Sequence, residues 1–226
     1  MTDSPKIFPL GDSCVTVDFG NEIAVELNTR AISLASHIEN DPFPGLIEVV
    51  PAYSSISVFY DLLEVRRHFS EFASAFNAVR SRVQAALASY EALETRSRQI
   101  EIPVDFGAAA ALDMSLVADR SGLSSAEVIE VFTARMYRVY MIGFLPGFAY
   151  MGTVDERIAV PRKDSPRLKV PKGSVGIASG QTGIYPLESP GGWQIIGKTD
   201  LEMFMPNSDS PCLLKAGDEV RFVALA

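Results

Sequence analysis

The fold of this chain is decided by YRVYMIGFLPGFAYMG (residues 137–152) and by VPRKDSPRLKVPKGSVGIASGQTGIYPLESPGGWQIIGKT (residues 160–199). Ten of the sixteen glycines lie between positions 143 and 197, together with six prolines. Both residue types interrupt helices and long strands. The composition therefore predicts short strands joined by shaped loops.

The pattern outward from this stretch predicts a closed β-barrel in the C-terminal part of the chain. Pro/Gly turns separate the short apolar runs, which favours a barrel over an open sheet. Two short helices are expected before it, over 113–120 and 125–132, the second with a capping pair of Ser124 and Glu127. The expected strands cover 137–144, 174–178, 183–186, 193–197 and 219–223.

The N-terminal part has a different pattern, in which strands alternate with long amphipathic helices. This order is typical of a split βαβ, ferredoxin-like α/β sandwich. We therefore predict an α+β protein with an N-terminal sandwich domain over 1–96 and a C-terminal barrel domain over 97–226. The expected elements are a strand at 13–19, a helix at 22–38 with Asn21 as its N-cap, strands at 46–51 and 55–60, a helix at about 62–93 and a strand at 98–104.

Composition narrows the class of protein. The 226 residues are 47% hydrophobic and 21% charged, with a net charge of −8, which is ordinary for a globular protein and unsuited to nucleic-acid binding. We see no signal-peptide pattern and no apolar run long enough for a membrane span, so we expect a cytoplasmic protein. Cys14 and Cys212 are far apart and not grouped with histidines, so we expect neither a metal site nor a disulfide.

Positive charge gathers between residues 157 and 199, where the local balance is +5. Arg162, Lys163, Arg167 and Lys169 lie among prolines that hold the segment extended. A stiff cationic segment loses little entropy on binding a carboxylate or phosphate, so these four residues are candidate anion ligands. The alternative is a solvated charged loop, as in most such runs.

Residues 192–199, GWQIIGKT, match the phosphate-loop pattern G-x-x-x-x-G-K-[ST]. A genuine phosphate loop follows an apolar strand and opens a helix, so that backbone N–H groups cradle the phosphates. Here the middle residues are bulky and strand-forming, and a Ser-Pro-Gly turn precedes them. We therefore interpret the segment as a β-strand.

Two further groups are candidate site residues. The glycine-rich loop and a later Gly-Gly-Trp turn either form tight structural turns or wall a pocket. A polar trio either orients an amide or lactam or caps a turn. The candidate wall residues are Gly143, Phe144, Pro146, Gly147, Phe148, Tyr150, Gly191, Gly192 and Trp193, and the polar trio is Gln181, Thr182 and Tyr185.

Catalytic residues cannot be assigned from the inventory. The two histidines, His37 and His68, fall in the expected N-terminal helices. A Ser-His or Cys-His pair inside the barrel is therefore excluded.

Four segments carry a family resemblance: GFLPGFAYMG, PRKDSPRLKVPKGSVGIASGQTGIYP, SPGGWQIIGKT and the N-terminal PLGDSCVTVDFGN. They resemble the KipI and allophanate-hydrolase-subunit-1 family. The resemblance implies a cyclophilin-like second domain. The family pattern often has His where this chain has Phe132 and Pro where it has Ala149, so a role of that His is not carried over.

The resemblance also implies a function. Bacterial members are largely assigned as the B subunit of an ATP-dependent 5-oxoprolinase, which opens 5-oxo-L-proline to L-glutamate together with an A and a C subunit. On this expectation ATP, with Mg, acts in the complex and is not bound tightly by this chain, which is inactive alone. The alternatives are a KipI-like inhibitor of a sporulation histidine kinase and a carboxyltransferase-type component of an allophanate- or urea-utilising system.

Overall fold

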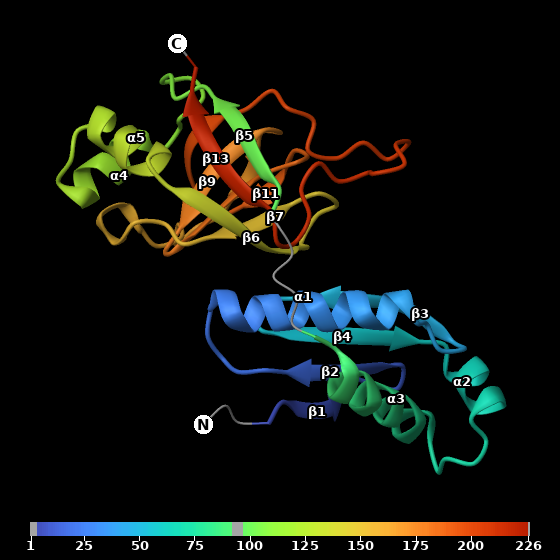
Figure 1. The fold of residues 1–226 in the computed structure, drawn as a ribbon. Helices are drawn as coiled ribbons and strands as arrows, with labels where there is room; N and C mark the ends of the chain where they lie inside the picture. Colours follow the sequence, from blue (N-terminus) through green and yellow to red (C-terminus); the bar gives the residue numbers. More distant parts are fainter. Residues whose placement is uncertain (1–3, 92–96, 226) are drawn as a thin grey trace. The chain divides into compact units, whose positions relative to one another are not determined.

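The computed structural model describes residues 4–91 and 97–225. The chain divides into two compact units, 1–96 and 97–226, which are coloured along the sequence in Figure 1. Each unit has its own hydrophobic core. That each part also folds independently stays a prediction.

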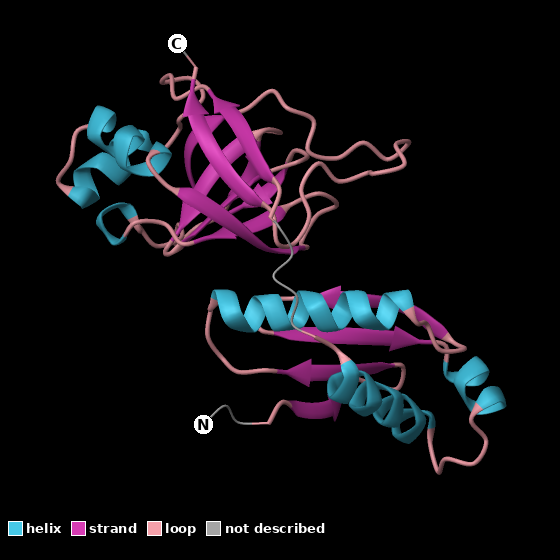
Figure 2. Ribbon diagram, viewed as in Figure 1, coloured by secondary structure: helices cyan, strands magenta, loops and turns pink. Residues whose placement is uncertain are grey.

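The first unit is a four-stranded antiparallel sheet with helices packed on it (Figures 1 and 2). The strand order is β1-β2-β4-β3, so β4 lies between β2 and β3 and runs antiparallel to both. Helix α1 connects β2 with β3. The elements are β1 (Lys6–Pro9), β2 (Cys14–Asp18), α1 (Val25–Asn40), β3 (Leu46–Pro51), β4 (Ser55–Tyr60), α2 (Leu62–His68) and α3 (Ala75–Ser89).

Alternation in β4 explains the core of this unit. Ile56, Val58 and Tyr60 are buried while the intervening residues are half-buried. Leu34 of α1 and Val79 of α3 pack in the same apolar cluster. One sheet face thus carries both long helices.

Three predictions for this unit were wrong in detail. The helix expected over 62–93 is two helices, because α2 ends at His68 and Ser74 caps a new helix by accepting a hydrogen bond from the Asn77 N–H at 3.1 Å. Helix α1 begins at Val25 and has no side-chain cap, so Asn21 is not its N-cap. The fourth strand is β1, which the sequence pattern did not reveal, and the strand expected at 98–104 belongs to the second unit.

The second unit contains a seven-stranded sheet with strand order β12-β9-β10-β7-β6-β13-β5. Strands β13 and β5 pair in parallel, and β11 with β8 forms a separate two-stranded ribbon. The elements are β5 (Gln99–Val104), α4 (Met114–Ser121), α5 (Ser125–Thr133), β6 (Met136–Ile142), β7 (Ala149–Gly152), a 3-10 turn η1 (Glu156–Ile158), β8 (Arg167–Val170), β9 (Ser174–Ala178), β10 (Gln181–Ile184), β11 (Ser189–Gly191), β12 (Gln194–Lys198) and β13 (Glu219–Ala224).

The two edge strands of this sheet meet through a single bridge, which nearly closes it into a barrel. The Asp105 N–H donates to the Lys198 carbonyl at 2.7 Å, and the Lys198 N–H donates back to the Asp105 carbonyl at 2.9 Å. Gly197 permits this approach, because a Cβ there would lie 2.5 Å from Val104 Cγ1. The GWQIIGKT segment is therefore a turn and a strand, as the sequence indicated.

Helices α4 and α5 pack against this sheet on one side of the unit (Figure 1). The predicted capping box at Ser124 and Glu127 is confirmed. Phe132 of α5 is fully buried and stacks on Phe222 with ring centroids 4.8 Å apart. Position 132 is thus a core position here.

Two features are absent from the described part of the chain. None of its helices is long and apolar enough to cross a membrane. Nor do its His, Cys, Asp and Glu side chains gather in any group of three that could hold a metal ion.

The closing bridge makes a stability prediction. Gly197→Ala forces a methyl group into the Val104 contact, and we expect a loss of about 1 to 3 kcal/mol in the free energy of unfolding. Urea denaturation of the whole chain measures it. Gly180→Ala is the matched control, because its Cβ would meet nothing closer than Thr153 Cγ2 at 3.6 Å. Equal stability of the two variants would contradict a tight closure at Gly197.

Candidate functional site

The cationic segment, residues 162–169, is bound by a buried carboxylate that the sequence did not reveal. Asp113 lies just before α4, and its side chain is 5% exposed. Arg167 donates to it through both terminal nitrogens, at 2.7 and 2.6 Å, and Lys163 Nζ lies 3.2 Å from Oδ1. The Ile195 N–H donates to Oδ2 at 2.7 Å. One carboxylate therefore ties the segment to both α4 and β12.

The charge balance at Asp113 explains its protonation state. Burial by itself raises the pKa of Asp113. The hydrogen bonds from Arg167, the Ile195 N–H and Lys163 outweigh burial and hold the pKa below its usual value. The group is therefore ionised at neutral pH, as a bidentate arginine pair requires.

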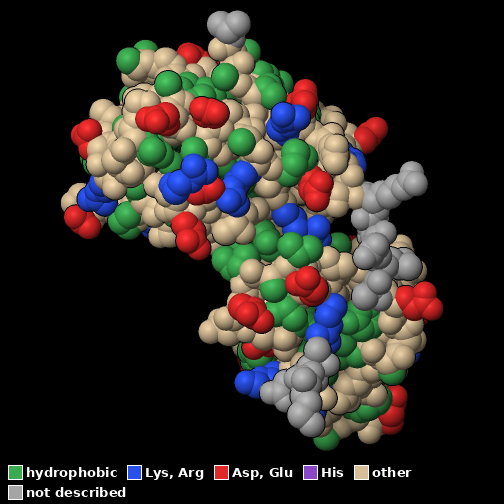
Figure 3. All heavy atoms as spheres, turned by 60° about the vertical axis from the view of Figure 1, so that its left-hand side comes forward, with side chains coloured by type: hydrophobic (Ala, Val, Ile, Leu, Met, Phe, Trp, Pro, Cys, Tyr) green, Lys and Arg blue, Asp and Glu red, His purple; other side chains and the backbone are tan. Residues whose placement is uncertain are grey.

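This arrangement changes the view of the four candidate anion ligands. Arg167 and Lys163 face Asp113, an internal anion, and Lys169 lies 3.0 Å from the surface carboxylate of Glu188. Arg162 makes no ion pair with the residues at 4–91 or 97–225. Of the four, Arg162 is therefore the cation whose charge no carboxylate among the described residues balances. Lys and Arg side chains are interspersed with Asp and Glu on the face of this unit seen in Figure 3.

Arg162 lies beside an aromatic cluster. Its guanidinium carbon is 5.7 Å from the centroid of the Trp193 ring. Phe148 is the centre of the cluster, in edge contact with Tyr150 at 4.8 Å, Tyr185 at 5.3 Å and Trp193 at 5.4 Å between centroids. Aromatic edge contacts of this kind fix ring orientation. The result is a rigid apolar wall with one exposed cation over it.

Burial determines the chemistry of the two tyrosines. Burial raises the pKa of Tyr150, and the positive charge of Arg162 offsets part of this effect. Burial likewise raises the pKa of Tyr185, against a hydrogen bond with the Trp193 backbone and the charge of Arg162. Both phenols are neutral at pH 7 and can act only as hydrogen-bonding and packing groups.

The glycine-rich loop packs closely against the rest of the unit. Gly147 has φ +82°, and a Cβ there would lie 2.9 Å from the Met203 carbonyl oxygen. Phe144 has φ +67°, an uncommon conformation for a side-chain-bearing residue, and is 60% exposed. The N–H of Gly143 donates to the Phe148 carbonyl at 3.1 Å. The loop, with Pro146 exposed at its tip, thus turns tightly and presents Phe144 outward.

The Gly-Gly turn is shaped by an aromatic ring. A Cβ at Gly191 would lie 2.4 Å from the Tyr185 hydroxyl oxygen, so this position accepts only glycine. Gly192 has more room, and its carbonyl accepts a hydrogen bond from the Lys163 N–H at 2.8 Å. The turn therefore joins the cationic segment to Trp193.

The polar trio does not form one cluster of free groups. Thr182 is fully buried, and its hydroxyl donates to the Gly176 carbonyl at 2.9 Å, which is a structural contact. Tyr185 is 1% exposed within the aromatic cluster. Gln181 is half-buried on β10, where it pairs with Gly152.

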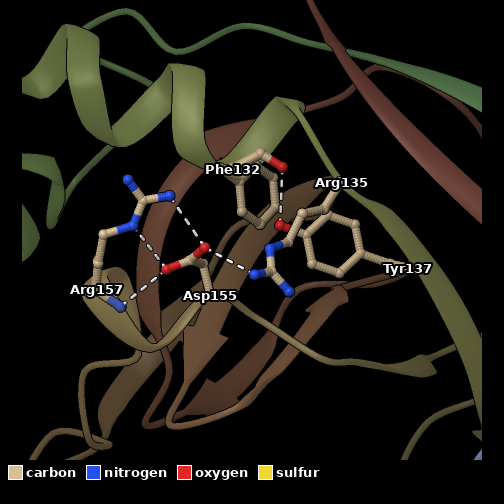
Figure 4. Close-up of polar contacts among 5 residues, drawn as sticks. All are labelled: Phe132, Arg135, Tyr137, Asp155 and Arg157. Atoms are coloured by element: carbon tan, nitrogen blue, oxygen red, sulfur yellow. Dashed lines mark hydrogen bonds and ion pairs between the residues drawn. The ribbon is translucent and has the colours of Figure 1, made fainter.

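A second carboxylate missed by the sequence analysis lies near the 3-10 turn (Figure 4). Asp155 accepts hydrogen bonds from the Arg157 side chain at 2.9 and 3.1 Å and from Arg135 at 2.8 Å. The hydrogen bonds from Arg157, together with the one from Arg135, lower the pKa of Asp155. The adjacent Tyr137 hydroxyl donates to the Phe132 carbonyl at 2.8 Å. These contacts link the end of α5 with η1, which is a structural role.

The histidines both belong to the first unit. His37 contacts Ser89, and His68 lies near Glu64. Cys14 is buried and Cys212 half-buried, both as free thiols. The described residues of the second unit therefore hold no Ser-His or Cys-His pair.

Asp113 makes a prediction about stability and pH. Asp113→Asn leaves Arg167 and Lys163 without their anion, and we expect a loss of about 3 to 5 kcal/mol at pH 7. Because the folded pKa is lowered, the wild-type contribution is complete above the unfolded value of ~3.9 and is lost as pH falls through the folded pKa.

Urea denaturation between pH 7 and pH 3 measures both effects. Glu188→Gln removes the exposed partner of Lys169 and is the control, with an expected change within about 0.5 kcal/mol. If Asp113→Asn were no more destabilised than this control, the tie would have no energetic weight.

Comparisons with known proteins come from both sequence and structure. A family model described as "Carboxyltransferase domain, subdomain C and D" matches residues 5–214. A Bacillus subtilis (strain 168) protein named as the B subunit of 5-oxoprolinase is 46% identical over 228 residues, which cover 100% of this chain and 95% of that protein. An Escherichia coli O157:H7 protein of the same name is 39% identical, over 96% of this chain and 95% of that one.

A crystal structure of the protein TTHA0988 superposes with a TM-score of 0.80 at 35% identity, over 94% of this chain. The match covers 40% of that longer chain. The resemblance seen in the sequence is thereby confirmed: the chain belongs to the family of carboxyltransferase-domain proteins, subdomains C and D, which includes the relatives named as 5-oxoprolinase B subunits.

Proposed function

We propose that this chain is the B-type subunit of an ATP-dependent 5-oxoprolinase, a complex that opens 5-oxo-L-proline to L-glutamate. The observation that carries the proposal is the extent of the similarity. Two relatives with this name match over 95% of their own lengths, at 46% and 39% identity. Neither relative thus has a large region without a counterpart here.

The aromatic cluster and Arg162 suggest that this chain binds part of the substrate. The substrate is a small lactam ring that carries one carboxylate. A guanidinium binds a carboxylate through two parallel hydrogen bonds, and Arg162 has no protein anion in the described structure. The half-buried ring of Tyr150 suits the apolar face of the lactam. Trp193 is buried and packs against Tyr150, with ring centroids 5.9 Å apart. In this proposal, Arg162 holds the carboxylate and the aromatic rings orient the lactam.

The site needs a partner to close it. Arg162 is exposed and Phe144 is 60% exposed, so water reaches the rings from one side. In TTHA0988 the matched region is part of a chain more than twice as long, which supports an adjoining polypeptide. We assign this place to the C subunit of the complex, with an A subunit also required.

ATP, with Mg, would supply the energy for lactam opening in such a complex. The described residues of this chain do not fit its phosphates. In the GWQIIGKT segment, the N–H of Lys198 donates to the Asp105 carbonyl in the closing bridge, so it is not available to a phosphate. Trp193 and Ile195 of the same segment are buried in the aromatic cluster. We therefore place the nucleotide on another polypeptide of the complex and route no step of the reaction through it here.

A carboxyltransferase-type role in a urea- or allophanate-utilising system is the second candidate. The description of the matching family model favours it. The two candidates differ in the substrate that the reconstituted complex consumes. A purely regulatory protein, the third class, would require no ligand at Arg162.

The proposal predicts the effect of removing Arg162. In the complex reconstituted with A and C subunits from the same organism, we expect Arg162→Ala to lower kcat/KM for 5-oxo-L-proline about tenfold or more. The reason is the loss of a charge-assisted pair worth ~1.5 to 3 kcal/mol. Arg162→Lys should restore only part of the lost kcat/KM, because an ammonium group cannot bind a carboxylate in the bidentate mode.

Lys169→Ala is the matched control. The substitution removes the same charge from the same segment. Because Lys169 pairs with Glu188 at the surface, kcat/KM should stay within about twofold of the wild-type value. Size-exclusion chromatography checks that each variant still assembles. Full activity of Arg162→Ala in an assembled complex would refute the ligand role, and turnover of urea or allophanate instead of 5-oxo-L-proline would favour the second candidate.

A further inference from the structure

The first unit contains a cavity of about 150 Å³ between the C-terminal halves of α1 and α3. This volume is well above the ~10 to 15 Å³ that one water molecule needs. The buried side chains of Ile38, Phe43 and Val83 form an apolar floor. Ala85 and Ala86 also line the cavity, together with the polar side chains of His37, Asp41, Arg82 and Ser89.

The histidine and serine in this lining form a clamp. His37 Nε2 lies 3.1 Å from Ser89 Oγ, and the same hydroxyl donates to the Ala85 carbonyl at 3.1 Å. Which of the two atoms donates depends on the tautomer of His37. In either case the pair ties the last turns of the two helices together.

The two charged residues of the lining have opposite signs and do not pair. Asp41 and Arg82 border the same cavity, yet neither takes part in an ion pair within residues 4–91 and 97–225. Helices α1 and α3 end at Asn40 and Ser89, and helix C-termini attract positive charge. The Asp41 end of the cavity thus favours a cation, and Arg82 favours an anion.

We propose that this cavity binds a small zwitterionic α-amino acid. The ammonium group pairs with Asp41, at the end of the cavity where helix α1 terminates. The carboxylate pairs with the Arg82 guanidinium. A short apolar side chain rests on Ile38, Phe43 and Val83. The proposal is independent of the function proposed for Arg162, because every residue involved lies in the first unit.

A pair of matched ligands tests the proposal on the full chain. L-Proline and 5-oxo-L-proline share a five-membered ring and a carboxylate, but only L-proline has an ammonium group. We expect L-proline, titrated into the ¹⁵N-labelled protein, to give saturable amide shifts at residues 37–43 and 82–89. 5-Oxo-L-proline should leave these amides at least tenfold less responsive.

Variants separate the two charges. Asp41→Asn and Arg82→Gln should each raise the Kd for L-proline tenfold or more, as read from the same amides. Glu39→Gln and Arg80→Gln change the same charges on the same helices at exposed positions outside the lining, and should leave the Kd within twofold. Well-dispersed spectra confirm that each variant is folded.

Three outcomes would overturn the proposal. The first is the absence of saturable shifts at these amides with L-proline. The second is an equal response to 5-oxo-L-proline, which would show that no ammonium is recognised. The third is an equal loss of binding in the control variants, which would reduce the effect to net charge.

Discussion

The site in the second unit depends on one buried carboxylate. Asp113 accepts hydrogen bonds from Arg167 and Lys163 of the cationic segment and from the Ile195 N–H of β12. Taking a carboxylate and a guanidinium out of water is costly, and only good geometry with further hydrogen bonds compensates the cost. Removing one partner of the buried pair therefore destabilises the fold by much more than the intact pair stabilises it relative to an apolar replacement. The tie fixes where the cationic segment runs, and so where Arg162 lies.

Glycines make the remaining contacts possible. Gly191 leaves room for the Tyr185 hydroxyl, and Gly197 leaves room for the barrel closure at Val104. With these contacts in place, Phe148 is in edge contact with four other rings, those of Phe144, Tyr150, Tyr185 and Trp193. Rigid rings lose little freedom when a ligand binds. The packing of the aromatic wall beside Arg162 thus depends on close backbone approach at Gly191 and Gly197.

Local sequence patterns predicted the regular elements well. The strands at 46–51, 55–60 and 174–178 were found at the expected residues, because alternation and turn residues mark them clearly. Strand β1 was not predicted because it is short and mostly exposed. The break at 69–74 was not predicted because Phe69, Phe72 and Phe76 keep helical spacing across it. The ribbon of β8 and β11 lies in Pro-rich segments that do not read as strands.

The candidate site was predicted less completely, for a physical reason. Charge density marked the cationic segment, but the anion that binds it lies 54 residues earlier than Arg167. An Asp before a helix is typical of a cap, and Asp113 makes no such side-chain bond. Nothing in the local sequence distinguishes Arg162, which has no ion pair among the described residues, from Arg167, which is paired with Asp113. Only the long-range contacts separate the two.

A double-mutant cycle tests the central claim most directly. Free energies of unfolding in urea are measured for the wild type, Asp113→Asn, Arg167→Gln and the double variant at pH 7. If Asp113 and Arg167 form the tie that positions the segment, the double variant should be more stable than the sum of the single losses predicts, by about 2 kcal/mol. Additivity within about 0.5 kcal/mol would contradict the account.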